Sequence, residues 1–277
     1  MTVLKKLILL VIAVCVCEGF SQTLRLASWN VRCIEKKDSL QGDAWSKRVP
    51  EIAKLIRFLD FEIVGMQEVD SVQHSDLFAL LPEYRWVPQS TEGNPIIYLA
   101  DRFDLMDHGA IWYSAGMIPG VKGWDAKHPR FCIWARFKDK KYGNDFFVFN
   151  AHWDHKGDTS RVESAKMTTS LLPRLALGRP FFFMGDLNSK PNRRALKIME
   201  ESGFNDARKE ASMVYASRPS FNHFRDNNPE DSNYDYIYFV GPVDVSRFGV
   251  MDNTYWDGKT RRYPSDHFPI MAEIKFR

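Results

Sequence analysis

Apolar runs recur along most of the chain, separated by short stretches of polar and turn-forming residues. Short continuous or alternating apolar runs predict strands, whereas apolar positions three to four residues apart predict amphipathic helices. These criteria predict strands at residues 24–31, 61–69 and 180–184, and helices at residues 47–59, 71–81, 160–177 and 193–202. Strands are expected again from the last helix to the C-terminus.

The first predicted helix has a clear apolar face and a proline near its start. Pro50 is expected in the first turn, where a missing N–H group costs nothing. The residues that form the apolar face are Ile52, Leu55, Ile56 and Leu59.

The stretch 84–149 has a different pattern, with runs of aromatic and β-branched residues broken by turn residues at 92–94 and 142–144. This pattern predicts antiparallel sheet. Together with the helices, it predicts an α+β fold in which two sheets pack together and helices cover them from outside.

The N-terminus resembles an export signal. Lys5 and Lys6 precede an apolar run at residues 7–16, followed by small and polar residues as far as Ser21. This order predicts a secretory signal peptide, and the run is shorter than the roughly 20 residues that span a bilayer. No stable membrane span is therefore expected.

Cleavage is expected between Ser21 and Gln22, which divides the chain into a signal peptide at residues 1–21 and a single domain at residues 22–277. The protein is thus predicted to be secreted or periplasmic, and a monomer. A lipoprotein anchor at Cys17 is the disfavoured alternative, because the preceding valine is bulkier than such a cleavage site accepts.

Composition and charge restrict the partners. Hydrophobic residues make up 44% of the 277 residues, enough for a sizeable core. The formal net charge is +3, and it falls to +2 without residues 1–21. A protein that covers a nucleic-acid backbone carries a basic patch. Nucleic acid is therefore not the favoured partner.

Two cysteines, Cys33 and Cys132, lie outside the predicted signal peptide. Export to an oxidising compartment would permit a disulfide between them. Both lie in apolar, strand-like surroundings where buried free thiols are common, so free thiols are the favoured expectation.

Polar residues gather where the apolar strands end, and such groups must be solvated, paired or bound. Each short segment alone also fits an ordinary turn or cap, but six of them together predict a site. The segments are Ser28-Trp29-Asn30, Gln67-Glu68-Val69, Asn150-Ala151-His152, Gly185-Asp186-Leu187-Asn188, Tyr234-Asp235-Tyr236 and Ser265-Asp266-His267.

Carboxylate and amide oxygens suit a hard cation such as Mg²⁺, with Mn²⁺ as a substitute, better than they suit zinc. The sequence has no His/Cys spacing typical of a zinc site. Histidines beside acids can neutralise and protonate a phosphoryl group, while an aspartate orients an attacking water.

Six strings in this order resemble the endonuclease/exonuclease/phosphatase superfamily, which includes deoxyribonuclease I: SWNVR, QEV, NAHWDH, GDLNSKP, YDYIYF and PSDHFP. The resemblance extends over residues 24–274. It implies a deoxyribonuclease I-like, four-layer α/β/β/α sandwich and metal-assisted attack of water on phosphorus.

The resemblance also implies roles for matching residues. Glu68 matches the main metal ligand, with Asn30 and Asp266 holding or orienting the metal. The others match catalytic positions: Asp186 orients the water, Asn188 contacts the phosphate, His267 touches the phosphoryl oxygens with Asp235 as its partner, and His152 is the second phosphate-side histidine.

Three further residues are candidates for substrate binding by resemblance to a secreted branch of the family, namely His155, Arg130 and Asn222. For His155, an equal alternative is that Asp154 and His155 order the loop before the helix at residue 160. Arg32 departs from the abasic-site endonucleases, which carry an acid at that spacing, and this puts their metal arrangement in doubt here.

The favoured function is hydrolysis of a phosphorylated small-molecule or lipid-linked substrate, monoester or diester. A secreted nuclease would use the same residues but would group Lys and Arg along the cleft. A catalytically silent binding protein on the same scaffold is the third alternative. It is disfavoured because a binder needs no complete proton-transfer apparatus.

Overall fold

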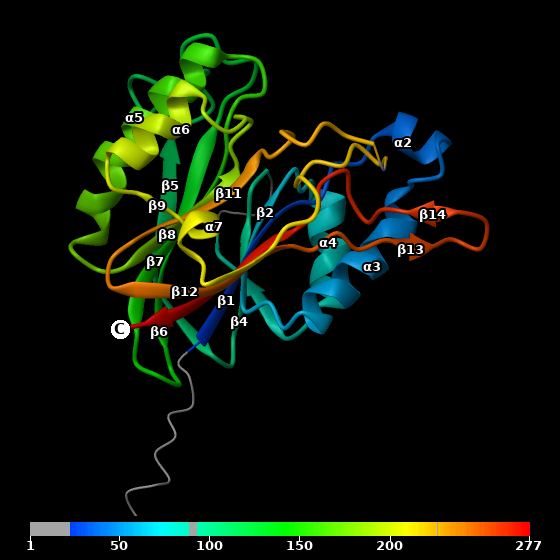
Figure 1. The fold of residues 1–277 in the computed structure, drawn as a ribbon, viewed down its shortest axis with the longest axis horizontal. Coiled ribbons are helices and arrows are strands. Elements are labelled where there is room, and N and C mark those ends of the chain that lie inside the picture. The colour runs from blue at the N-terminus through cyan, green and yellow to red at the C-terminus, as the bar shows by residue number, and fades with distance from the viewer. Residues whose placement is uncertain (1–22, 89–92, 226) are drawn as a thin grey trace, which may run out of the picture.

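Two β-sheets lie face to face between outer layers of helices in the computed structural model of this protein, which describes residues 23–88, 93–225 and 227–277 (Figure 1). The predicted signal peptide lies outside these residues. The α+β expectation is confirmed. No helix in the described ranges is long and apolar enough to cross a membrane.

The first sheet has seven strands in the order β10-β12-β15-β1-β2-β4-β3. β1 pairs in parallel with β2 and antiparallel with β15. The strands are β1 (Thr23–Asn30), β2 (Ile63–Gln67), β3 (Tyr84–Trp86), β4 (Ile96–Leu99), β10 (Met213–Tyr215), β12 (Val243–Val250) and β15 (Ile270–Phe276).

The second sheet has six strands in the order β5-β6-β7-β8-β11-β9. β7 and β8 are parallel, and β11 is antiparallel to β8. The strands are β5 (Phe103–Trp112), β6 (Phe131–Asp139), β7 (Asp145–His152), β8 (Phe181–Asp186), β9 (Asn205–Asp206) and β11 (Asp235–Val240), and a separate hairpin is formed by β13 (Tyr255–Trp256) and β14 (Arg261–Arg262).

The four long predicted helices are confirmed within a few residues as α3 (Trp45–Phe58), α4 (Ser71–Leu80), α5 (Asp158–Ala176) and α6 (Arg194–Glu201). Two short helices, α2 (Lys36–Leu40) and α7 (Ala207–Glu210), were not predicted from the pattern. The position of Pro50 was wrong: α3 begins at Trp45, so the proline lies inside the helix, past its first turn.

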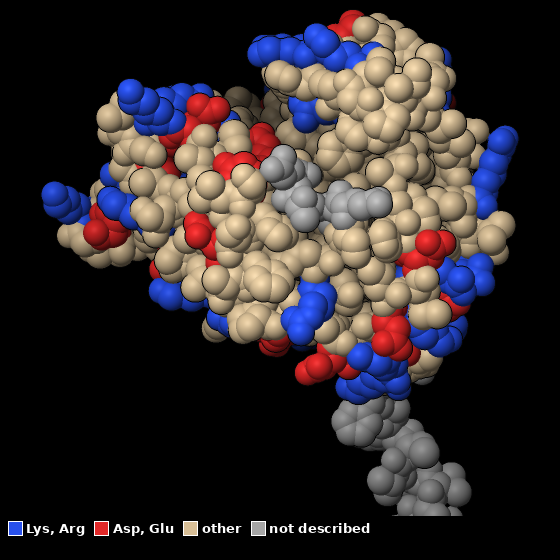
Figure 2. Space-filling view, turned by 180° about the vertical axis from the view of Figure 1, so that it is seen from behind, with Lys and Arg blue, Asp and Glu red and all other residues tan. Residues whose placement is uncertain are grey.

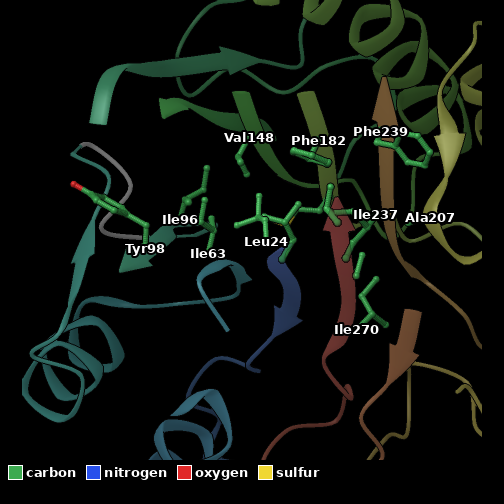
Figure 3. Close-up of a cluster of buried hydrophobic side chains, with 14 of the residues drawn as sticks. Leu24, Ile63, Ile96, Tyr98, Val148, Phe182, Ala207, Ile237, Phe239 and Ile270 are labelled. Carbon is green, nitrogen blue, oxygen red and sulfur yellow. The ribbon is translucent and has the colours of Figure 1, made fainter. Parts of the chain in front are cut away.

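Three apolar layers hold the sheets and helices together. One fills the space between the sheets, and includes Leu24, Ile63, Phe182 and Ile237 (Figure 3). A second joins the outer face of the second sheet to α5 and α6, and a third joins the outer face of the first sheet to α3 and α4. The four-layer sandwich follows from this alternation.

Strand alternation carries polar residues into the same inter-sheet layer. On β8, Phe182 and Met184 face the central core, and the next inward position is Asp186. The register places Asp186 beside both His152 of β7 and Asp235 of β11. One end of the inter-sheet layer is therefore apolar and the other carries the predicted site residues.

Candidate active site

A cleft of about 970 Å³ opens at this polar end. Its walls include Glu68, His152, Asp186, His267 and Asn188, all predicted from the sequence. Figure 2 shows the surface hollowed at the top of the view, with basic side chains nearby and acidic ones on one lip. Basic and acidic side chains are interspersed over the described part of this face.

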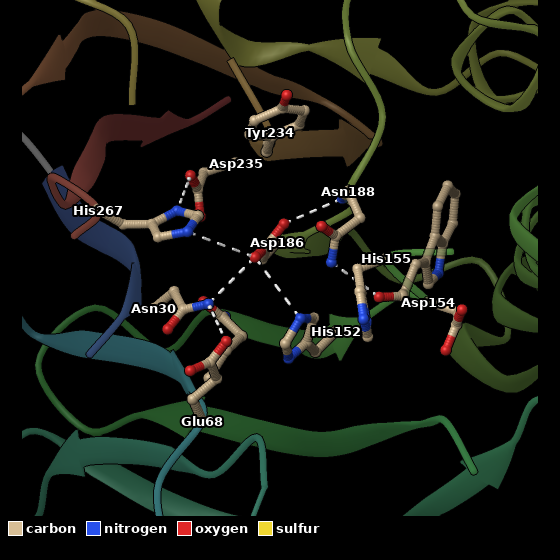
Figure 4. Close-up of polar contacts among 12 residues, drawn as sticks. Asn30, Glu68, His152, Asp154, His155, Asp186, Asn188, Tyr234, Asp235 and His267 are labelled. Atoms are coloured by element: carbon tan, nitrogen blue, oxygen red, sulfur yellow. Dashed lines mark hydrogen bonds and ion pairs between the residues drawn. The ribbon is translucent and has the colours of Figure 1, made fainter. Parts of the chain in front are cut away.

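Asp186 lies at the centre of the site (Figure 4). Its Oδ2 accepts a hydrogen bond of 3.1 Å from the Asn30 amide and lies 3.6 Å from His152 Nε2 and 3.8 Å from His267 Nε2. Its Oδ1 accepts from the Asn188 backbone N–H at 2.9 Å. Burial, opposed by the charge of His267, raises the pKa of Asp186 to about 7. Asp186 can therefore accept a proton near neutral pH.

His267 forms a buried pair with Asp235, whose Oδ2 lies 2.8 Å from His267 Nδ1. Burial alone would lower the pKa of His267, but the charge and hydrogen bond of Asp235 prevail and raise it to about 10. His267 Nε2 therefore points toward Asp186 as a positively charged donor. This is the pairing that the sequence resemblance implied.

His152 has the opposite character. Burial and the nearby charge of Arg130 lower the pKa of His152 well below its usual range, so it is neutral in the free protein. The protonated histidine of this site is His267, and the free protein does not support His152 as the proton donor to a leaving oxygen.

Glu68 follows β2 and breaks the strand alternation. Its φ of +62° lies in the left-handed region, an unfavourable conformation for this residue type. The carboxylate accepts hydrogen bonds of 3.1 Å from the Asn30 amide and from the Cys33 backbone N–H. Burial would raise the pKa of Glu68, but the hydrogen bonds from Asn30 and the Cys33 N–H, together with the charge of Arg32, hold this pKa below its usual range. The strained backbone at Glu68 thus positions its ionised carboxylate at the cleft wall.

This donor set fits a divalent cation. Glu68 supplies an ionised carboxylate, Asn30 orients it, and oxygen donors suit a hard ion. Asp186, Asp235 and His267 also place ligand atoms within 4.8 Å of one another. That group is the weaker candidate, because Asp235 already pairs with a positively charged His267, and a cation would repel it.

Arg32 adds a positive charge that was not predicted as part of the site. It binds Asp38 at 2.8 Å, and it lies 3.8 Å from both Glu68 and Asp266. Burial raises the pKa of Asp266. Asp266 thus lies beside Arg32, and a role in holding the metal stays a prediction.

Arg130 and His155 line the cleft, as predicted for substrate-binding residues. Asn222 does not fit that prediction, because its amide holds the backbone. Its Nδ2 donates to the Ser265 carbonyl at 3.1 Å, and its Oδ1 accepts from the Phe224 N–H at 2.8 Å. Buried in these bonds, it supports the loop that carries Asp266 and His267.

Sequence reasoning missed Arg48 of α3, which is 1% exposed. Its guanidinium donates to four backbone carbonyls at 2.7–3.0 Å, and so joins the loop after β1 to the loop before β15. A charged residue in line with the apolar Ile52 and Ile56 was the available signal. The carbonyls are those of Val31, Arg32, Asp43 and Pro264.

The family model described as Endonuclease/Exonuclease/phosphatase family matches residues 27–267. No curated protein matches the chain. A solved endonuclease/exonuclease/phosphatase family protein from Bacteroides thetaiotaomicron is 34% identical, with a TM-score of 0.88, and the match covers 93% of this chain and 99% of the other.

A mannosyl-6-phosphatase from the same organism is also 34% identical, with a TM-score of 0.87, and the match covers 91% of this chain and 100% of the other. D. rerio TDP2, solved with a single-stranded DNA product, is 15% identical with a TM-score of 0.70, covering 92% of this chain and 99% of the other. At that identity the similarity supports the fold alone.

Proposed function

The chain belongs to the endonuclease/exonuclease/phosphatase family, and from this premise we propose that it is a divalent-metal-dependent hydrolase of small phosphate esters. The observation that carries the proposal is that two buried, neighbouring side chains differ in how readily they lose a proton. Asp186 titrates near neutrality while His267, 3.8 Å away, is held positive. A base for water and a cation for phosphoryl oxygens thus lie side by side.

The residues divide the work as follows. Asp186 accepts a proton from the attacking water, and Asn30 and Asn188 hold its carboxylate in place. His267 neutralises charge on the phosphoryl group, and Asp235 keeps it protonated. A bound Mg²⁺ held at Glu68 would supply Lewis-acid stabilisation of the phosphoryl oxygens, and Mn²⁺ would substitute.

The favoured substrates are small phosphorylated compounds, with sugar phosphates first. Two observations support this choice: the similarity to a mannosyl-6-phosphatase over nearly the whole chain, and the mixed charges around the cleft, where a nuclease would group Lys and Arg. A lipid-linked phosphate would present the same headgroup chemistry.

The test is turnover of a phosphate-ester panel by the purified protein with Mg²⁺, with Mn²⁺ and with EDTA. We expect metal-dependent release of phosphate from sugar phosphates, lost in Asp186→Asn and in His267→Ala. Asp104→Asn is the matched control, because this carboxylate is 57% exposed on β5 of the same sheet. Activity that survives EDTA, or no turnover of any phosphate ester, contradicts the proposal.

We also propose that residues 1–21 direct export and are then removed. N-terminal sequencing of the protein recovered from outside the cytoplasm should begin at Gln22. A protein that keeps residues 1–21 would contradict this assignment.

A further inference from the structure

Two loops form one wall of the cleft and carry several basic side chains. The first precedes β6 and contains Lys127, His128 and Arg130, and the second follows β7 and contains His155. The pairing of β6 with β7 places these two loops side by side, and one further contact ties them to each other.

That contact is the carboxylate of Asp154, which is 0% exposed. Its Oδ1 accepts from the N–H groups of Lys156 and Gly157, both at 2.9 Å. Its Oδ2 accepts from the N–H groups of Lys127 and His128 at 3.0 and 3.2 Å, and lies 3.4 Å from Arg130 Nε. One buried carboxylate therefore joins both loops.

The two side chains that Asp154 brings together contact each other directly. Arg130 Nη2 lies 3.3 Å from His155 Nδ1. Because an arginine is always protonated and donates, Nδ1 must accept, which places the proton of a neutral His155 on Nε2. The His155 ring also stacks on His128, with centroids 5.8 Å apart. Arg130 thus offers a charge, and His155 a donor of fixed orientation.

The N-terminal end of α5 could also attract an anion, but the side chain of Asp125 already binds its free N–H groups. The N-terminus of α5 begins beside these loops, but Asp125 caps it by accepting from the Ser160 and Thr159 N–H groups at 2.7 and 3.2 Å. Asp125 thus takes up part of the favourable potential of that helix end. The positive charge that faces the cleft from this wall comes from side chains.

A phosphate monoester carries nearly two negative charges at neutral pH, whereas a diester carries one. His267 and Glu68 lie on the opposite side of Asp186 from His155 (Figure 4). We propose that Arg130 and His155 bind the second anionic charge of a phosphate monoester, and that Asp154 is the positioning residue that aligns them. The inference rests on the proposed function and narrows its substrate class to monoesters.

The test compares a sugar phosphate monoester with the methyl diester of the same phosphate, as kcat/KM for each. In Arg130→Gln we expect the monoester value to fall about 10- to 100-fold, because a charged hydrogen bond to substrate is lost. The diester value should fall at least about tenfold less. Arg130→Lys should restore part of the monoester value, since it keeps the charge without the fork.

The matched control is Arg136→Gln, because Arg136 is an arginine on β6 that pairs with Asp145 at 2.7 Å outside the cleft. It should leave the ratio of monoester to diester unchanged. Asp154→Asn should lower this ratio mainly through a higher KM for the monoester, because the loops lose their common acceptor. If Asp154→Asn does not fold, Arg130→Gln and His155→Gln still test the proposal, because each should lower the ratio of monoester to diester kcat/KM.

Binding of inorganic phosphate, measured by calorimetry, separates this inference from the proposed function. Wild type that binds phosphate at least about tenfold more tightly than Arg130→Gln supports the binding wall even if the substrate panel fails. Wild type that hydrolyses the diester as well as the monoester, or an Arg130→Gln variant with an unchanged ratio, overturns the inference while the hydrolase proposal stands.

Discussion

The two ends of the inter-sheet layer are built on the same strands but obey different rules. At one end Phe182 and Ile237 are fully buried among apolar neighbours. At the other, the inward positions of the same two strands are Asp186 and Asp235. The strand pattern sets only the direction of each side chain. The residue type at each inward position decides whether that side chain stabilises the fold or takes part in the site.

The energetic cost also differs between the ends. Burying apolar side chains stabilises the folded state. Burying Asp186 raises its pKa, which means that the folded state disfavours its charged form. The apolar end is therefore expected to increase the unfolding free energy, whereas the polar end is expected to lower it because its side chains are kept reactive.

The largest expected effect is at the polar end. Asp186→Asn keeps the shape of the side chain but removes the proton acceptor, so kcat should fall about 10³- to 10⁴-fold. The unfolding free energy in EDTA at pH 8 should equal or exceed that of wild type, because a buried charge disappears. Steady-state kinetics and urea unfolding measure the two quantities. A variant that is both inactive and clearly destabilised would contradict the expectation that Asp186 serves activity at a cost in stability.

The reverse pattern is expected at the apolar end. Phe182→Ala removes a fully buried ring and should lower the unfolding free energy by about 3–5 kcal/mol. The kcat per folded molecule should stay close to wild type. Phe58→Ala is the matched control, because Phe58 is 83% exposed and its loss should change the unfolding free energy little.

A third change tests the boundary between the ends. Asn150 lies inside β7, where its Oδ1 accepts from Gln67 at 2.7 Å and its Nδ2 donates to backbone carbonyls beside β2 and β4. Gly65 makes room for it, since a Cβ there would lie 2.7 Å from the Asn150 amide. This network connects the two sheets next to Glu68.

Asn150→Ala removes the hydrogen bond from Gln67 and those to three backbone carbonyls, which should cost about 2–3 kcal/mol of unfolding free energy. Because β2 leads directly into Glu68, the apparent affinity for Mg²⁺ should fall as well. Urea unfolding and a metal titration of activity would measure both. A loss of stability with unchanged metal affinity would mean that Asn150 contributes only to the stability of the fold and not to the position of Glu68.

The pH dependence of stability also distinguishes the two ends. The pKa of His267 is raised to about 10, above the roughly 6.5 expected in the unfolded chain. Its contribution is therefore fully present below pH 6.5 and is lost as the pH rises to 10. In EDTA, the stability of wild type relative to His267→Gln should therefore fall steadily as the pH rises over this range. A difference that stays constant with pH would refute the raised pKa.

The sequence predicted the polar end better than the contacts that support it. Asp186 and His267 were found because each follows or precedes an apolar strand, and strand ends of packed sheets meet. Arg48 and Asn150 were not assigned these roles, and for Asp154 only the ordering of its own loop was considered, because the other contacts reach backbone or amide groups that are brought close only by folding. No local pattern encodes such partners.

The wrong expectations have a similar origin. Asn222 has the residue type of a substrate contact, yet its neighbours in the fold are carbonyl and N–H groups of its own loop and the loop of Ser265. Pro50 was placed in the first turn because the helix was predicted to begin at residue 47, whereas α3 begins at Trp45, which already belongs to its buried face. Periodicity marks the buried face of a helix, and not its first residue.

The smallest expected effect concerns the two cysteines, one at the polar end and one in the apolar layer between the second sheet and α5. Both thiols are free: Cys132 is buried in the layer beneath α5, and Cys33 lines the cleft. Burial raises the pKa of Cys33 to about 12 and that of Cys132 further, so neither is a reactive thiolate at neutral pH. Reducing agent should therefore leave the Tm unchanged, and iodoacetamide should label both slowly. A disulfide would contribute about 2–5 kcal/mol, so a Tm that falls by several degrees on reduction would mean that the cysteines link the cleft covalently to the layer beneath α5, and that the stabilities of these two parts cannot vary independently.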